Sequence, residues 1–209
     1  TGRKLKFTLP GPMTIVDTVF KALTPAIPER AIAGHHADLV CGMLNGINPK
    51  TNEFYIAFIG PTGGGWGAKQ SQDGVSATVC INDGDTHNSP AEQLETKYPL
   101  LIESYSLRED SGGAGEYRGG LGCENTVQAR ADLMLNAQVD RMHCKPWGLN
   151  GGKEAAGNAV VLRANGEWKE DYPNAKLLTA RIKQGDAFAM RSGGGGGFVS
   201  AKCLIPRLV

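Results

Sequence analysis

The chain has 209 residues, which is enough for about one domain with a sizeable core. Hydrophobic residues make up 41% and charged residues 21%, a balance that argues against wholesale disorder. The formal net charge is +1 with acids and bases interleaved, so the chain lacks the basic footprint of a nucleic-acid or membrane-surface binder. The one deviation is the 29 glycines, roughly twice the usual usage.

The sequence favours a cytoplasmic location. It has no apolar run near the roughly 20 residues of a membrane helix, and its N-terminus lacks the apolar region of a secretory signal. It begins at Thr1 without a methionine, which predicts a fragment or a processed chain. The five cysteines include no C-x-x-C pair and are expected to be reduced: Cys41, Cys80, Cys123, Cys144 and Cys203.

The strongest helix signal runs from Pro12 to Leu23. Its apolar residues recur at helical spacing, and Pro12 suits a first turn. We predict that this apolar face packs into the core. The residues concerned are Ile15, Val16, Val19, Phe20 and Leu23.

A metal site is one interpretation of the stretch that follows. His35, His36 and Asp38 stand close together, and imidazole and carboxylate groups bind zinc, manganese or iron. Neighbouring residues of a strand point to opposite faces, so both histidines could bind one ion only on irregular backbone. The alternative is a hydrogen-bonded turn that leads into the next segment.

The glycine-dense stretch from Gly60 to Ala68 allows two interpretations. The glycines either let backbone pack closely against backbone, or they expose N–H groups to a ligand. A Walker pattern is absent, and the spacing of Gly63, Gly65 and Ala68 matches a dinucleotide loop without a helical pattern after it. Backbone packing is the commoner use of such glycines.

Alternating and β-rich runs dominate the rest of the chain. We predict a turn cluster at 45–53, a helix start at Ser89 and hairpins around 164–166 and 184–186. The predicted strands are Phe54–Ile59, Val75–Ile81, Tyr98–Leu107, Glu124–Ala129, Leu133–Val139, Ala159–Arg163, Glu167–Lys169, Leu177–Ile182 and Ala187–Met190. The expected class is α+β with β predominating: a mixed segment over 1–122, then a β-rich segment over 123–209 that forms a sandwich or barrel, packed as one unit.

Several motifs in a fixed order resemble the hydantoinase B/oxoprolinase family. They begin with Gly63–Ala68 followed by Asp73-Gly74, and continue with Asn88-Ser-Pro-Ala-Glu92 and Asp110–Gly122. The last ones are Asp140-Arg141, Pro146–Gly152 and the run Gly193–Gly197. Family polypeptides are usually much longer, so the resemblance implies the C-terminal portion of a B-type subunit.

The resemblance implies a subunit of an ATP-dependent complex that hydrolyses cyclic amides of the hydantoin, oxoproline or lactam type. An A-type partner would bind ATP and Mg²⁺ and phosphorylate the substrate carbonyl, and the N-terminal portion of the B-type subunit would be a second partner. A divalent metal in the complex would have its ligands outside this chain. Two alternatives stay open: an ATP-dependent ketone carboxylase, and a structural subunit without catalytic residues.

Within that family scheme we select candidate site residues. Asp73, Asn88 and Glu92 are expected to line a shared cavity as catalytic candidates. Gly64, Gly65, Trp66 and Arg118 are the candidates for substrate binding. Arg108 and Arg118 would suit a carboxylate or phosphate, but a clamp on neighbouring loop carbonyls and on Asp110 is the commoner role of such an arginine.

Overall fold

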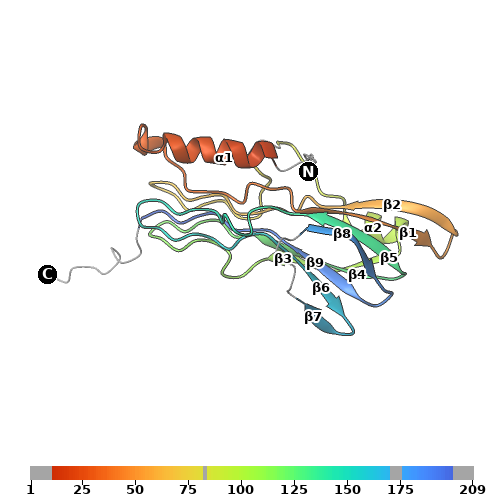
Figure 1. The fold of residues 1–209 in the computed structure, drawn as a ribbon. Coiled ribbons are helices and arrows are strands. Elements are labelled where there is room, and N and C mark those ends of the chain that lie inside the picture. The colour runs from red at the N-terminus through yellow and green to blue at the C-terminus, as the bar shows by residue number, and fades with distance from the viewer. Residues whose placement is uncertain (1–10, 82–83, 170–175, 200–209) are drawn as a thin grey trace, which may run out of the picture.

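The computed structural model describes residues 11–81, 84–169 and 176–199, so Thr1 and Cys203 lie outside the described residues. The molecule is elongated. Two β-sheets occupy one end, and long extended segments run side by side toward the other end, with the helix α1 (Gly11–Leu23) lying along them (Figure 1). Strands predominate over helices, which confirms the α+β class. Neither described α-helix is long and apolar enough to cross a membrane.

The two sheets form a sandwich around one core. Within each sheet the strands pair antiparallel, in the orders β2-β1-β5-β8 and β3-β4-β9-β6-β7. The core contains Leu44, Ile59 and Leu135 from the first sheet with Phe188 and Met190 from the second. The strands are β1 (Cys41–Asn48), β2 (Glu53–Ile59), β3 (Leu100–Leu107), β4 (Cys123–Ala129), β5 (Leu133–Gln138), β6 (Ala159–Ala164), β7 (Glu167–Lys169), β8 (Lys176–Ile182) and β9 (Ala187–Arg191).

Most of the predicted elements are present. The helix over 12–23 is confirmed as α1, and the helix start near Ser89 as α2 (Ala91–Lys97). The hairpin of β6 and β7 is confirmed, and Asn165 and Gly166 both have positive φ, as its two-residue turn requires. Strands on both sides of residue 122 pair with each other, β1 with β5 and β3 with β4.

Three predictions are wrong. The turn at 184–186 does not close a hairpin, because β8 pairs with β5 in one sheet while β9 pairs with β4 and β6 in the other. Val75–Ile81 forms no strand; its backbone hydrogen-bonds to glycine segments instead. The turn predicted over 45–53 is shorter, since β1 continues to Asn48 although it contains Gly42 and Gly46.

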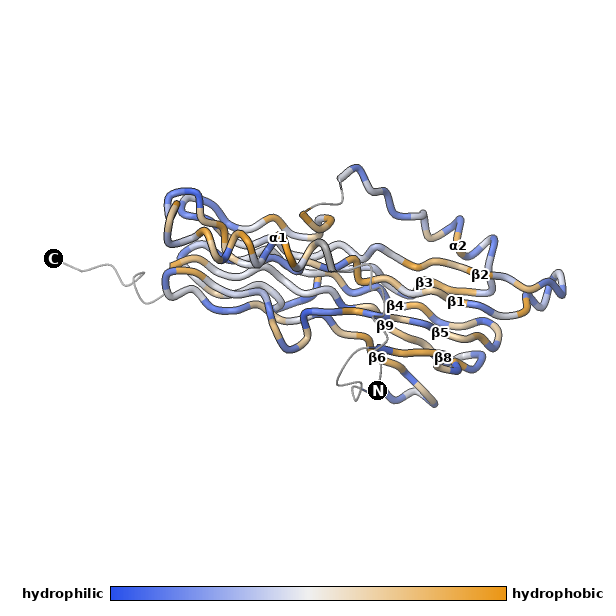
Figure 2. The backbone as a smooth tube through the Cα atoms, turned by 45° about the horizontal axis from the view of Figure 1, so that its top comes forward, coloured by the Kyte–Doolittle hydropathy of each residue, from blue (hydrophilic) through white to orange (hydrophobic). Residues whose placement is uncertain are grey.

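The other half of the molecule is a bundle of extended segments, which we call the glycine bundle. It comprises 31–36, 61–68, 73–79, 111–122, 146–157 and 192–199, linked by backbone hydrogen bonds between segments. In Figure 2 these segments run as long, mostly pale tubes, as expected for glycine-rich backbone of intermediate hydropathy. The interpretation of the glycines as sites of close backbone packing is therefore confirmed.

Gly193–Gly197 lies inside the glycine bundle. A Cβ on Gly195 would lie 1.8 Å from the Trp66 carbonyl oxygen, and a Cβ on Gly196 would lie 1.9 Å from that of Trp147. Gly194 and Gly197 donate to one segment, and Gly195 and Phe198 donate to another, a spacing of three residues that is the period of polyproline II backbone. The donor and acceptor pairs are Gly194 to Ala156, Gly195 to Gly120, Gly196 to Gly34 and Gly197 to Lys153.

The prediction that the apolar face of α1 packs into the core is wrong. The ridge of Ile15, Val19 and Leu23 faces outward, with exposed fractions of 65%, 47% and 46%. The inward residues are Met13 and Asp17, of which Asp17 is 1% exposed. The helix therefore turns a carboxylate toward the glycine bundle and presents hydrocarbon outward.

Gly195→Ala tests the packing of the bundle. We expect it to lower the free energy of unfolding by about 3 kcal/mol or more, because backbone must move to admit the methyl group. Gly84→Ala is the matched control, since a Cβ there meets nothing within 4 Å, and its effect should stay within about 0.5 kcal/mol. Urea denaturation measures both, and equal midpoints for the two variants would contradict the packing described.

Candidate functional site

A cavity of about 270 Å³ lies between the edge strands β2 and β3. The end of β2, the start of α2 and strands β3 and β4 surround it, which places it at the open edge of the sandwich. Its apolar lining residues include Phe58, Pro61, Ala91, Leu94 and Ile102. Its polar lining side chains are Asn88, Ser89, Tyr105 and Asn125. An apolar cavity with a few convergent polar groups is the usual form of a small-molecule site.

Hydrogen bonds hold the polar wall of this cavity. The Tyr105 hydroxyl accepts the Gly63 N–H at 3.1 Å and the Asn88 side-chain amide at 3.2 Å. Tyr105 on β3 lies directly opposite Asn125 on β4 in the register of the sheet, so their side chains share one face. The Asn125 carbonyl oxygen is buried and has no hydrogen-bond partner among the described residues.

Two titratable groups in and beside this wall, Tyr105 and Cys123, are uncharged at neutral pH. Burial raises the pKa of the Tyr105 hydroxyl above its usual value. Burial also raises the pKa of the Cys123 thiol, which is hydrogen-bonded to Tyr105. The wall therefore offers neutral donors and acceptors, a character that suits a neutral polar ligand.

The three catalytic candidates lie in different places. Asn88 lines the cavity, and Glu92, on α2, lines a shallower neighbouring hollow with Phe58. Asp73 is exposed on a loop, where its carboxylate accepts the Arg118 backbone N–H at 2.7 Å. The structure thus brings one of the three to the cavity and a second to its margin.

The four substrate-binding candidates belong to the glycine bundle. The N–H groups of Gly64, Gly65 and Trp66 donate to backbone carbonyls of other segments, and the Trp66 indole donates to the Val79 carbonyl at 2.7 Å. Arg118 is exposed. By contrast, Arg108 donates to the carbonyls of Gly157 and Ser192, which confirms for Arg108 the carbonyl part of the expected clamp.

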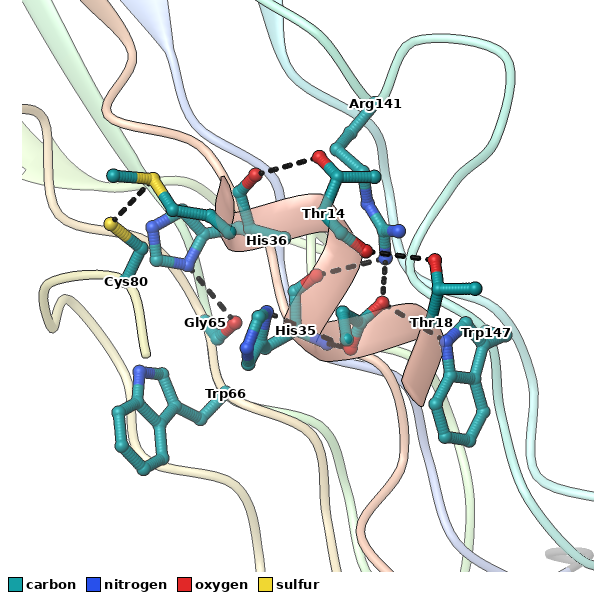
Figure 3. A network of polar contacts seen from close by, with 12 residues as sticks. Thr14, Thr18, His35, His36, Gly65, Trp66, Cys80, Arg141 and Trp147 are labelled. Carbon is teal, nitrogen blue, oxygen red and sulfur yellow. Dashed lines mark hydrogen bonds and ion pairs between the residues drawn. The ribbon is translucent and has the colours of Figure 1, made fainter. Parts of the chain in front are cut away.

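The three candidate metal ligands are buried and turn to different partners, as Figure 3 shows for His35 and His36. His36 Nδ1 lies 3.4 Å from the Gly65 carbonyl oxygen, while the Asp38 carboxylate accepts the Asp140 N–H and the Asn158 side-chain amide. Within the described ranges, no group of three or more histidine, cysteine, aspartate or glutamate side chains is arranged to hold a metal ion.

Burial also controls the charge of these groups. It lowers the pKa of His36 to about 3, so the imidazole is neutral at pH 7. It raises the pKa of Asp38 to about 6, which still leaves a carboxylate at pH 7, and this carboxylate is stabilised by its N–H donors. Burial lowers the pKa of His35 as well.

A buried ion pair fastens α1 to the bundle beside His35 (Figure 3). The Asp17 carboxylate lies 2.9 Å from the Arg141 guanidinium and accepts the Trp147 indole N–H at 3.1 Å. The same guanidinium donates to the His35 carbonyl at 2.9 Å, and His35 Nδ1 lies 3.7 Å from the Asp17 carboxylate. These contacts account for a charged residue on the inward face of the helix.

Sequence reasoning missed Tyr105, Asn125 and Asp17. For Asn125 a signal was present: in the predicted strand Glu124–Ala129 it has the same phase as Val127, which points inward, so its amide had to be buried. For Asp17 the signal was a single acid within an otherwise apolar helical pattern. The position of Tyr105 depends on a bulge in β3 between Ile102 and Ser104, which the pattern does not reveal.

The comparisons agree on one family. The family model described as hydantoinase B/oxoprolinase matches residues 9–201. The uncharacterized protein MJ0963 of Methanocaldococcus jannaschii is 37% identical over 89% of this chain and 31% of its own length. The caprolactamase subunit beta of Pseudomonas jessenii is 32% identical over 88% of this chain and 33% of its own.

Solved structures share the fold. The ATP-dependent caprolactamase from Pseudomonas jessenii matches with a TM-score of 0.71 at 24% identity, over 86% of this chain and 32% of that one. An ATP-dependent acetone carboxylase matches with a TM-score of 0.63 at 22% identity, over 82% of this chain and 27% of that one. The chain therefore spans about a third of these relatives. With a family model that matches nearly all of its length, this chain belongs to the hydantoinase B/oxoprolinase family.

Proposed function

We propose that this chain is the C-terminal part of a B-type subunit in an ATP-dependent complex that hydrolyses cyclic amides. Family membership supports the B-type assignment, and a relative of the chain is a caprolactamase subunit. The observation that carries the proposal is a pair of apolar surfaces that are exposed in the part of the chain that the structure describes. Such surfaces are typical of a component that works in contact with other chains.

The two surfaces lie on α1 and on the outer face of β1 and β2. On α1 the surface is the ridge of Ile15, Val19 and Leu23. On the sheet, Phe54 and Phe58 of β2 are 63% and 47% exposed. Ile56 lies between them on β2, and Met43 and Ile47 on β1 lie opposite Phe58 and Phe54. All three of these residues are exposed as well. Burying each such side chain stabilises an association by about 1.5–3 kcal/mol.

We assign these surfaces to two partners, an A-type subunit that binds ATP with Mg²⁺ and the N-terminal portion of the B-type subunit. Phosphorylation of an amide oxygen makes the carbonyl carbon a better electrophile, so that ring opening is coupled to ATP. In this scheme Asn88 and Glu92 contribute to the cavity, and Asp73 supports the Arg118 backbone within the glycine bundle. A divalent metal, if the complex uses one, has its ligands outside this chain.

Ile15→Asp tests the contact through α1. We expect it to weaken association with the partner chains at least about tenfold, because it places a charge where apolar surface is buried. Thr18→Asp is the matched control: Thr18 is exposed on the same helix, outside the apolar ridge. Native mass spectrometry of titrated complexes gives both affinities. Equal assembly of the two variants would remove this surface from the proposal.

Turnover by the assembled complex tests the reaction. We expect lactams or hydantoins to stimulate ATP hydrolysis without bicarbonate, and Asn88→Ala to lower the turnover per complex at least about tenfold because it removes a group of the cavity wall. Asp73→Ala should instead lower stability by about 1 kcal/mol, since Arg118 loses a hydrogen-bond acceptor. A requirement for bicarbonate and a ketone would indicate a carboxylase. Unchanged turnover in Asn88→Ala, Glu92→Ala and Arg118→Ala would indicate a purely structural subunit.

A further inference from the structure

We propose that Asn125 recognises the cyclic amide by pairing its side-chain carboxamide, edge to edge, with the ring amide of the substrate. This inference rests on the proposed function and names the ligand chemistry of the cavity between β2 and β3. It makes Asn125 a binding residue that selects closed rings over open-chain amides.

The position of Asn125 supports this role. Asn125 lines the cavity from β4 and is 7% exposed, and its carbonyl oxygen has no partner among the described residues. A buried acceptor without a partner destabilises the free protein, and a ligand N–H would remove that cost. The neighbouring Tyr105 oxygen already accepts two hydrogen bonds, from Gly63 and Asn88. Among the described residues, the buried acceptor of this wall that lacks a partner is the Asn125 carbonyl oxygen.

The geometry of a ring amide matches that group. A small ring forces its amide into the cis form, which places the N–H and the C=O on the same edge. An asparagine carboxamide also presents one N–H and one C=O on a single edge. The two edges can therefore form two parallel hydrogen bonds. An open-chain secondary amide is trans and presents its N–H and C=O on opposite edges, so it can form only one of them at a time.

The rest of the cavity fits the remainder of such a ring. Phe58, Pro61, Leu94 and Ile102 supply apolar surface for ring methylenes, and about 270 Å³ suits a small ligand. Hydrolysis of a lactam ring adds water across the C–N bond and yields a carboxylate and an ammonium group on one open chain. Neither charge is matched by a neutral carboxamide in an apolar wall, so the product binds more weakly than the substrate.

A ketone offers no N–H to the Asn125 oxygen. Binding a cyclic ketone would leave the buried acceptor without a partner, whereas binding a lactam satisfies it. Sites built to hydrogen-bond a substrate N–H reject analogues that lack it far more strongly than sites that sense size alone. The unpaired oxygen therefore favours an amide over a ketone of equal size.

A ligand panel tests the pairing on the assembled complex without ATP, by calorimetric or ligand-observed NMR titration. The probes are 2-piperidinone, N-methyl-2-piperidinone, cyclohexanone and an open-chain secondary amide of similar size. We expect 2-piperidinone to bind at least about tenfold more tightly than each of the others, because it alone can form both bonds. Equal affinities for the lactam and its N-methyl derivative would overturn the inference without any variant.

Two variants assign the discrimination to the residue. Asn125→Leu keeps a similar volume and should abolish the preference for the N–H lactam, leaving the four affinities within about threefold of one another. Gln70→Ala, an exposed substitution outside the cavity lining, should keep the preference. Retention of the tenfold preference in Asn125→Leu would overturn the inference.

Turnover separates this inference from the proposed function. If the complex prefers the N–H lactam but no cyclic amide stimulates its ATP hydrolysis, the site stands and the proposed reaction fails. If lactams drive ATP hydrolysis while binding shows no N–H preference, the reaction stands and the role of Asn125 fails.

Discussion

The contact on which this structure depends is backbone against backbone inside the glycine bundle. At Gly195 a methyl carbon added to the backbone would lie 1.8 Å from the Trp66 carbonyl oxygen, so the neighbouring segment lies where any side chain would need to be. Glycine costs about 0.5–1 kcal/mol more conformational entropy than alanine. Hydrogen bonds from successive residues to three different segments offset that cost and fix each segment relative to the others.

This packing explains the unusual orientation of α1. A bundle whose segments meet through carbonyl and N–H groups offers few apolar side chains for a helix to cover. The helix is held by polar contacts instead, with Asp17 bound to Arg141 and to the Trp147 indole. Its apolar ridge then has no place inside the chain and faces outward. Removing one partner of such a buried ion pair leaves an uncompensated charge, which typically costs about 3–5 kcal/mol.

The sequence predicted those parts of the fold whose side chains follow a period of two or 3.6. Phe54–Ile59 and Glu124–Ala129 alternate or are β-rich, and both are strands. In the glycine bundle the period of three lies in the direction of the backbone hydrogen bonds and leaves no pattern in the side chains. The sequence of Val75–Ile81 therefore predicted a strand that the structure does not contain. In the site, Asn88 was predicted because it lies in a family motif. Asn125 became visible only when β3 and β4 were placed opposite each other.

The glycine bundle also positions the cavity. Gly63 donates its N–H to the Tyr105 hydroxyl, and its carbonyl accepts the hydroxyl of Ser192, which in turn accepts the Cys123 N–H. These bonds join the end of the bundle to β3 and β4, the strands that carry Tyr105 and Asn125. Because the glycine segments cannot shift without backbone clashes, they hold this wall rigid. A pre-organised wall loses less entropy when a small ligand binds. The glycine segments, whose N–H groups donate to backbone carbonyls, thus determine where the carboxamide of Asn125 lies.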